Sequence, residues 1–123
     1  MLDVRGSIAQ LRSTTEHHFQ HIKNQHDFMR IWAVQFELGY TDFRTIQMAL
    51  QLDGKIELLK RFAKDYDQVY HYEYAFAAGG LAGFNEQFGS EIAAYDQAHQ
   101  TLIATLDEIS RFQPAADEDS KLV

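Results

Sequence analysis

The sequence predicts an all-α fold, an antiparallel bundle of three to four helices, and two observations support it. Apolar residues recur every three or four positions along most of the 123-residue chain, which is the spacing of amphipathic helices. Between two such stretches lies Gly39-Tyr40-Thr41-Asp42, a segment typical of a joint between helices. With 46% hydrophobic residues, the chain is also long enough to bury one core.

The first predicted helix has apolar-compatible positions at Val4, Ile8, Leu11, Thr15, His18, Ile22, Gln25, Met29, Trp32 and Phe36. One long N-terminal helix through all of them would measure on the order of 50 Å and could bury this stripe only against other long helices or a second subunit. We therefore expect a homodimer, with an interface that contains His18, Gln25, Met29, Trp32, Tyr70 and Tyr72. A break near residues 24–27 would instead divide the segment into two shorter helices.

The segment 39–42 is expected to end one helix and begin the next. Gly39 can adopt a positive φ and stop a helix. Thr41 is a favourable N-cap, and Asp42 would place negative charge at the positive end of the following helix dipole. The segment therefore predicts a helical hairpin.

The remaining elements follow the same spacing. A helix from Asp42 is expected to stop or kink at Asp53-Gly54, to resume at Ile56 and to end at Gly79-Gly80. After a predicted loop, Ser90 should cap a last helix, which carries Ile92, Tyr95, His99, Leu102, Leu106 and Ile109 on one face. We expect one helical domain over residues 1–113 and a flexible acidic tail over residues 114–123.

An α+β fold is the alternative. Residues 31–40 and 69–76 alternate apolar and polar side chains and are rich in aromatic residues, which is typical of strands. These two segments could form a two-stranded sheet, although two strands alone make a sheet of low stability.

The charge and composition exclude several classes of function. The net charge of -7 disfavours direct nucleic-acid binding, because phosphate contacts require a basic surface, and it suits a basic protein partner. The absence of cysteine excludes disulfides and thiolate chemistry and is consistent with a cytoplasmic protein. No segment is long and apolar enough to span a membrane.

The histidines are the residues best suited to metal binding. His17 and His21 lie one helical turn apart, as do Asp96 and His99 in the last predicted helix. If these helices pack together, the four side chains could bind zinc or iron within a bundle. Otherwise no cofactor is expected, and these histidines would lie on a solvated face.

Arg12 and His17 are separated by four residues. This element resembles the Arg-x4-His element of helical ribonucleases of the HEPN class. The resemblance implies a dimer in which the arginine binds phosphate and the histidine acts on the 2′-hydroxyl of RNA.

The chain contains no phosphate-binding glycine loop and no nucleophile–base set with a recognisable spacing. We therefore expect a non-enzymatic protein that acts through protein–protein interaction, as a regulator, inhibitor or adaptor. The metal-binding bundle and the ribonuclease-like dimer are the alternatives.

Overall fold

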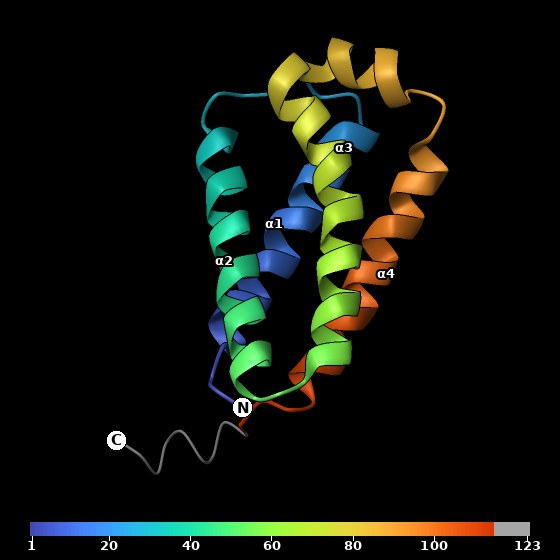
Figure 1. Ribbon diagram of the computed structural model, residues 1–123. Helices are drawn as coiled ribbons and strands as arrows, with labels where there is room; N and C mark the ends of the chain where they lie inside the picture. Colours follow the sequence, from blue (N-terminus) through green and yellow to red (C-terminus); the bar gives the residue numbers. More distant parts are fainter. Residues whose placement is uncertain (115–123) are drawn as a thin grey trace.

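The computed structural model describes residues 1–114, which form four α-helices packed as a bundle (Figure 1). The helices are α1 (Arg5–Lys23), α2 (Trp32–Leu52), α3 (Ile56–Phe88) and α4 (Ile92–Ser110). The helices pack in the ring α1–α2–α3–α4–α1, and α1 also contacts α3 across it. The prediction of an all-α bundle is confirmed, and the described residues contain no strand at either 31–40 or 69–76. Apart from Pro114, the predicted acidic tail lies outside the described residues.

The predicted joint at residues 39–42 is wrong. α2 runs without interruption through this segment. Gly39 is buried where α2 crosses α1, and Thr41 donates its hydroxyl to the Glu37 carbonyl of the preceding turn. Asp42 is buried against α1 rather than placed at a helix N-terminus, and burial raises the pKa of its carboxyl.

The first helical break lies at the end of α1 instead. The Gln25 amide bonds to the Ile22 carbonyl at 3.1 Å, and the His26 amide bonds to the His21 carbonyl at 2.9 Å. These are the two hydrogen bonds of a Schellman motif, with Gln25 in the left-handed conformation at φ 60°. The long N-terminal helix is therefore two helices, joined by residues 24–31.

The predicted stop at Asp53-Gly54 is confirmed. Gly54 has φ 71°, and the Lys55 amide bonds to the Leu50 carbonyl at 3.0 Å, so α2 ends in the same Schellman geometry. The expected cap at Ser90 is wrong by one residue. Glu91 occupies the N-cap position of α4, and its side chain makes no capping hydrogen bond.

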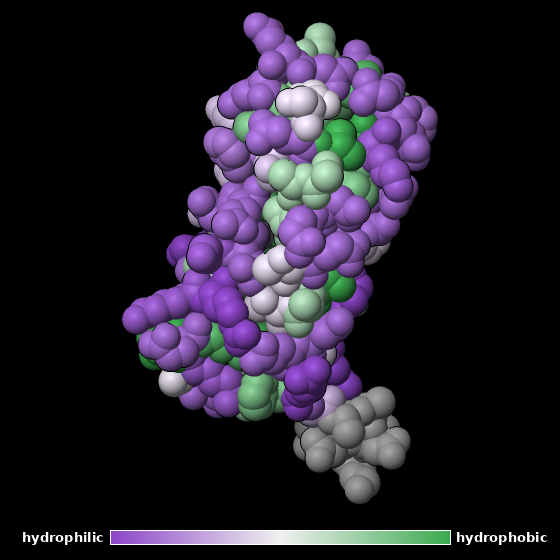
Figure 2. All heavy atoms as spheres, turned by 90° about the vertical axis from the view of Figure 1, so that its right-hand side faces the viewer, coloured by the Kyte–Doolittle hydropathy of each residue, from purple (hydrophilic) through white to green (hydrophobic). Residues whose placement is uncertain are grey.

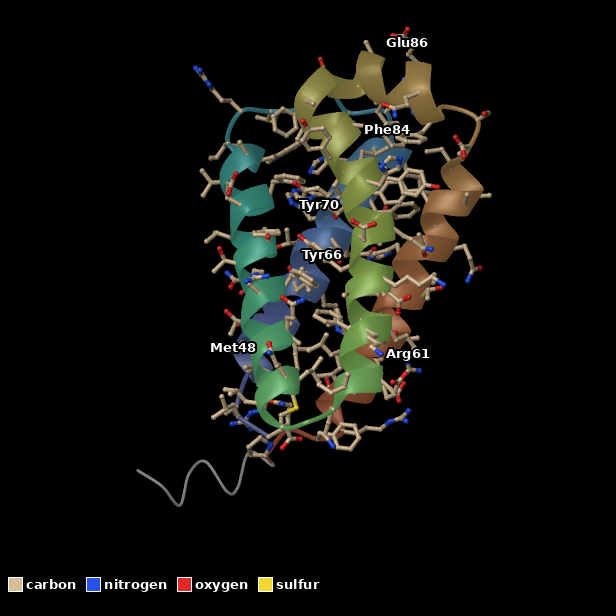
Figure 3. All side chains as sticks on the ribbon, viewed as in Figure 1. Met48, Arg61, Tyr66, Tyr70, Phe84 and Glu86 are labelled. Atoms are coloured by element: carbon tan, nitrogen blue, oxygen red, sulfur yellow. The ribbon has the colours of Figure 1, made fainter. Side chains whose placement is uncertain are left out.

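Gly79-Gly80 produces a bend rather than an end. Gly80 has φ 66° and interrupts the helical backbone, after which residues 81–88 form a short helical arm across one end of the bundle (Figure 1). Asp27 caps this arm, because its Oδ1 accepts the Phe28 and Leu81 amides, both at 2.8 Å. Phe84 points from the arm into the core, whereas Glu86 points away from it (Figure 3). The loop predicted over residues 81–89 is therefore mostly helix.

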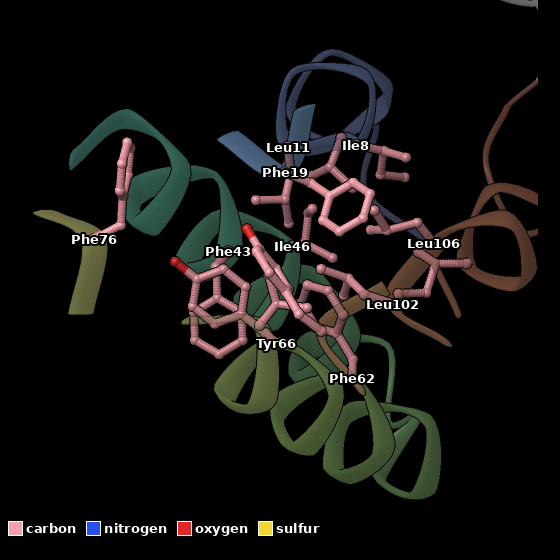
Figure 4. Close-up of a cluster of buried hydrophobic side chains, with 14 of the residues drawn as sticks. Ile8, Leu11, Phe19, Phe43, Ile46, Phe62, Tyr66, Phe76, Leu102 and Leu106 are labelled. Atoms are coloured by element: carbon pink, nitrogen blue, oxygen red, sulfur yellow. The ribbon is translucent and has the colours of Figure 1, made fainter. Parts of the chain in front are cut away.

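The core lies along the inner faces of all four helices (Figure 4). Its completely buried side chains include Leu11, Ile46, Phe62, Leu102 and Leu106. Aromatic residues of α3 fill the space toward α2, where Tyr66 stacks on Phe43 at a ring-centroid distance of 4.2 Å and Tyr70 lies above it (Figure 3). Within residues 1–114, no helix is long and apolar enough to cross a lipid bilayer.

Candidate functional site

The histidines of α1 form a chain of contacts rather than a converging metal site. His17 Nε2 lies 2.7 Å from His21 Nε2, and His21 Nδ1 lies 2.9 Å from His26 Nδ1. Because these contacts use opposite nitrogens of the His21 ring, the three histidines cannot direct lone pairs at one ion. His21 also lies on the ring of Trp32, and burial lowers the pKa of its imidazole, with a smaller contribution from the neighbouring histidines.

The second predicted pair lies elsewhere. His99 is completely buried between α4 and α1, where its ring stacks on Phe19 and its Nε2 is 3.5 Å from Glu16 Oε2. Asp96 is exposed, and His17 faces α2, where it contacts Gln35. The structure therefore does not bring His17 and His21 together with Asp96 and His99. Among residues 1–114, no group of three or more histidine, aspartate or glutamate side chains is arranged to hold a metal ion.

Arg12 and His17 also point to different neighbours. Arg12 forms an ion pair with Asp107 on α4, and His17 hydrogen-bonds Gln35 on α2 at 3.1 Å. The two side chains that resemble the ribonuclease element thus lie on opposite sides of α1 and share no contact.

A buried polar cluster occupies the core between α1, α3 and α4. His18 Nδ1 lies 3.0 Å from Glu73 Oε2, and both side chains are buried. Among residues 1–114, five buried polar atoms have no hydrogen-bond partner: His18 Nε2, Glu73 Oε1, Tyr95 Oη and both ring nitrogens of His99. Polar atoms in a protein interior are normally hydrogen-bonded, so the burial of these five atoms costs folding free energy.

Burial disfavours the charged forms of two members of this cluster, His99 and Tyr95. Burial lowers the pKa of His99, although Glu16, Glu73 and Asp96 each act in the opposite direction. Burial raises the pKa of the Tyr95 hydroxyl well above its usual value, and the charges of Glu73 and Glu16 add to the effect. Sequence patterns predict His18 at an interface and do not reveal Glu73 as a buried partner, because a carboxylate in an aromatic-rich helix gives no local sign of burial.

The outer face of α2 carries a row of exposed apolar side chains. The row consists of residues that are alternately three and four positions apart. They are Ile31, Val34, Leu38, Thr41, Thr45, Met48 and Leu52. We call this row the α2 outer stripe. Its five large apolar side chains are 44% to 69% exposed. Single exposed apolar residues are ordinary on a protein surface, whereas a contiguous row of them is typical of an interaction site.

The two threonines of the stripe are suited to burial. The Thr41 hydroxyl donates to the Glu37 carbonyl at 3.2 Å, and the Thr45 hydroxyl donates to the Thr41 carbonyl at 3.0 Å. Because both donors are satisfied within the helix, a partner could cover the threonines without leaving an unpaired hydrogen-bond donor. The face on the α4 side differs, because hydrophilic residues predominate there and apolar ones form only a narrow, interrupted band (Figure 2).

The predicted interface residues are largely engaged inside the chain. His18 and Trp32 are buried, and Tyr72 stacks on Tyr95 with ring centroids 4.8 Å apart. Tyr70 packs against Phe36, and Gln25 accepts a hydrogen bond from Asn85. Met29 is 55% exposed and adjoins the beginning of the α2 outer stripe. The expected joint at Gly39 divides the stripe and hides it in the sequence. If residues 31–52 are read as one helix, the spacing of three and four positions reveals the stripe.

Together these features define a four-helix bundle with one apolar outer helix face. Comparison of the chain with protein-family models, with curated proteins and with solved structures found no match.

Proposed function

We propose that this protein is a non-enzymatic helical module that binds another protein chain through the α2 outer stripe. The observation that carries the proposal is the exposure of five large apolar residues in one row along α2 and its N-cap residue, Ile31. α2 has 21 residues, so the row is about 30 Å long, which suits a helix-on-helix interface.

The charges beside the stripe do not select a uniformly basic partner. Arg30, Glu37 and Arg44 lie along its edge with alternating sign. The apolar contact would therefore provide the affinity, and the flanking charges would determine register and orientation.

The experiment compares Leu38→Glu with a matched control, Ile56→Glu. Leu38 and Ile56 are 44% and 43% exposed, but only Leu38 belongs to the stripe. Both tagged variants and the wild type are expressed in the source cells, and the chains cross-linked to each are measured by quantitative mass spectrometry. We expect Leu38→Glu, but not Ile56→Glu, to abolish a specific association. Retention of every wild-type contact by a folded Leu38→Glu protein would refute the proposal.

The two alternatives receive less support from the geometry. A zinc or iron site would need ligands beyond His17 and His21, and RNA cleavage would need Arg12 and His17 to act at one place. Metal analysis of untagged protein, with a His17→Ala/His21→Ala variant, tests the first. An RNA cleavage assay with Arg12→Ala and His17→Ala tests the second.

A further inference from the structure

We propose that the occupant of the α2 outer stripe is the same stripe of a second copy, packed antiparallel about a two-fold axis at Thr41. This inference rests on the proposed function and names its partner. Three features of α2 support it: the symmetry of the stripe, the charges along its edge and the satisfied threonine hydroxyls.

The stripe is self-complementary when it is reversed. Its spacing of three and four places Thr41 at the centre, with three members on either side. In an antiparallel pair Thr41 would lie opposite Thr41 of the second copy, and the other contacts would be Ile31 with Leu52, Val34 with Met48, and Leu38 with Thr45. Large apolar residues thus meet at both ends, while smaller side chains allow close approach at the centre. A two-fold axis generates such an interface from one surface patch.

The edge charges select the antiparallel orientation. The residues that immediately precede Ile31, Leu38, Thr45 and Leu52 are Arg30, Glu37, Arg44 and Gln51. In an antiparallel coiled-coil pair these edge positions face one another, so Glu37 would lie opposite Arg44 of the second copy, twice per dimer. In a parallel pair they would face the other edge, where Asp42 and Ala49 would leave Glu37 and Arg44 without an exposed opposite charge.

The charged partners are available for this pairing. Glu37 and Arg44 are both exposed, and the Arg44 guanidinium donates a hydrogen bond to Gln47 on its own helix, at 3.0 Å. On the other edge, Asp42 and Ala49 are buried against the bundle. A shallow groove of about 270 Å³ between α1 and α2 also adjoins Leu38, so a second copy would extend its contact over Ser13 and Thr14.

Cysteine cross-linking tests the orientation, because the chain contains no cysteine of its own. Thr41→Cys, at the axis, should cross-link to itself under mild oxidation. Val34→Cys and Met48→Cys should not cross-link alone, because in the antiparallel pair the two copies of either residue are about 20 Å apart along the helix. An equimolar mixture of these two variants should give a cross-linked heterodimer. Efficient self-cross-linking of Val34→Cys and Met48→Cys would indicate a parallel pair and overturn the proposal.

Charge reversal tests the edge contacts independently. Glu37→Arg alone and Arg44→Glu alone should each weaken self-association about tenfold, because like charges would then face each other at both ends. The double variant, and a mixture of the two single variants, should restore association, because opposite charges meet again. Equal association of all four samples by sedimentation equilibrium would overturn the assigned register.

The outcomes separate this inference from the proposed function. A wild-type chain that remains monomeric in sedimentation at about 100 μM, well above typical dimer constants, refutes the homodimer. If Leu38→Glu still loses a cross-linked contact in cells, the stripe binds a different protein and the proposed function survives. If Leu38→Glu loses nothing, both proposals fail.

Discussion

Replacing Gly39 with alanine should stabilise this protein, although the sequence alone predicts the opposite. Where a glycine ends a helix at positive φ, replacing it with any residue that has a side chain destabilises the protein. In the structure Gly39 lies in the interior of α2 and is buried against α1. A Cβ at this position would lie 3.5 Å from Thr14 Cγ2 and 3.9 Å from Leu11 Cδ1, which are ordinary van der Waals distances.

The magnitude follows from the helix interior. Glycine costs about 1 kcal/mol relative to alanine at such a position, because its unfolded backbone has more freedom to lose. The added methyl group also fills space against α1 without displacing its neighbours. We therefore expect Gly39→Ala to raise the free energy of unfolding by about 1 kcal/mol and the melting temperature by roughly 3–5 °C.

Urea unfolding followed by the fluorescence of the buried Trp32 measures this difference. The control is Gly80→Ala, where φ is 66° and a Cβ would lie 3.0 Å from Asp27 Oδ1. This variant should be destabilised by about 1–2 kcal/mol, the usual penalty for a left-handed alanine. A clear loss of stability in Gly39→Ala would show that the helix does not continue through this residue, or that α1 and α2 are packed more tightly than described.

Three further predictions concern the core and the α3 arm. Phe62→Ala, at a completely buried position, should cost about 3–5 kcal/mol of unfolding free energy in urea titrations, whereas Tyr74→Ala at an exposed position should change it little. Asp27→Ala should increase amide hydrogen exchange across residues 81–88, because Leu81 loses its acceptor. These bonds lower the pKa of Asp27, so the same loss should develop in the wild type as pH falls below about 4 and protonates the carboxylate. Burial lowers the pKa of His99, so the unfolded chain binds a proton at this residue more readily than the folded protein does. The free energy of unfolding should therefore decrease as pH falls below about 6.5. His99→Leu should flatten that pH dependence in unfolding titrations between pH 7.5 and 5.5, and an unchanged slope would contradict this account.

Helix ends show where sequence reasoning succeeded and failed. Gly54 was recognisable because a glycine stood where the apolar pattern paused, and its backbone has φ 71°. The end of α1 was harder to locate, since Gln25 adopts the left-handed conformation that usually requires glycine. Gly39 misled in the opposite direction, because a glycine in the interior of a helix is identical in sequence to a glycine that ends one.

The candidate site was less accessible to sequence reasoning. The pattern of Ile31, Leu38 and Leu52 is local and readable, but whether it faces the core or the solvent depends on how α2 rotates against α1 and α3. The burial of His18 and Glu73 is likewise a tertiary result, because it depends on a contact across 55 positions of the chain.

The class of fold follows from the sequence alone, because the repeat of apolar residues at helical spacing is a local property that only amphipathic helices satisfy throughout. The tertiary structure decided which face of each helix is buried, since the packing of four helices selects among apolar stripes that look equivalent in one dimension. α2 carries two such stripes, one in the core and one on the surface. That difference in burial makes the outer one a candidate for binding a second chain.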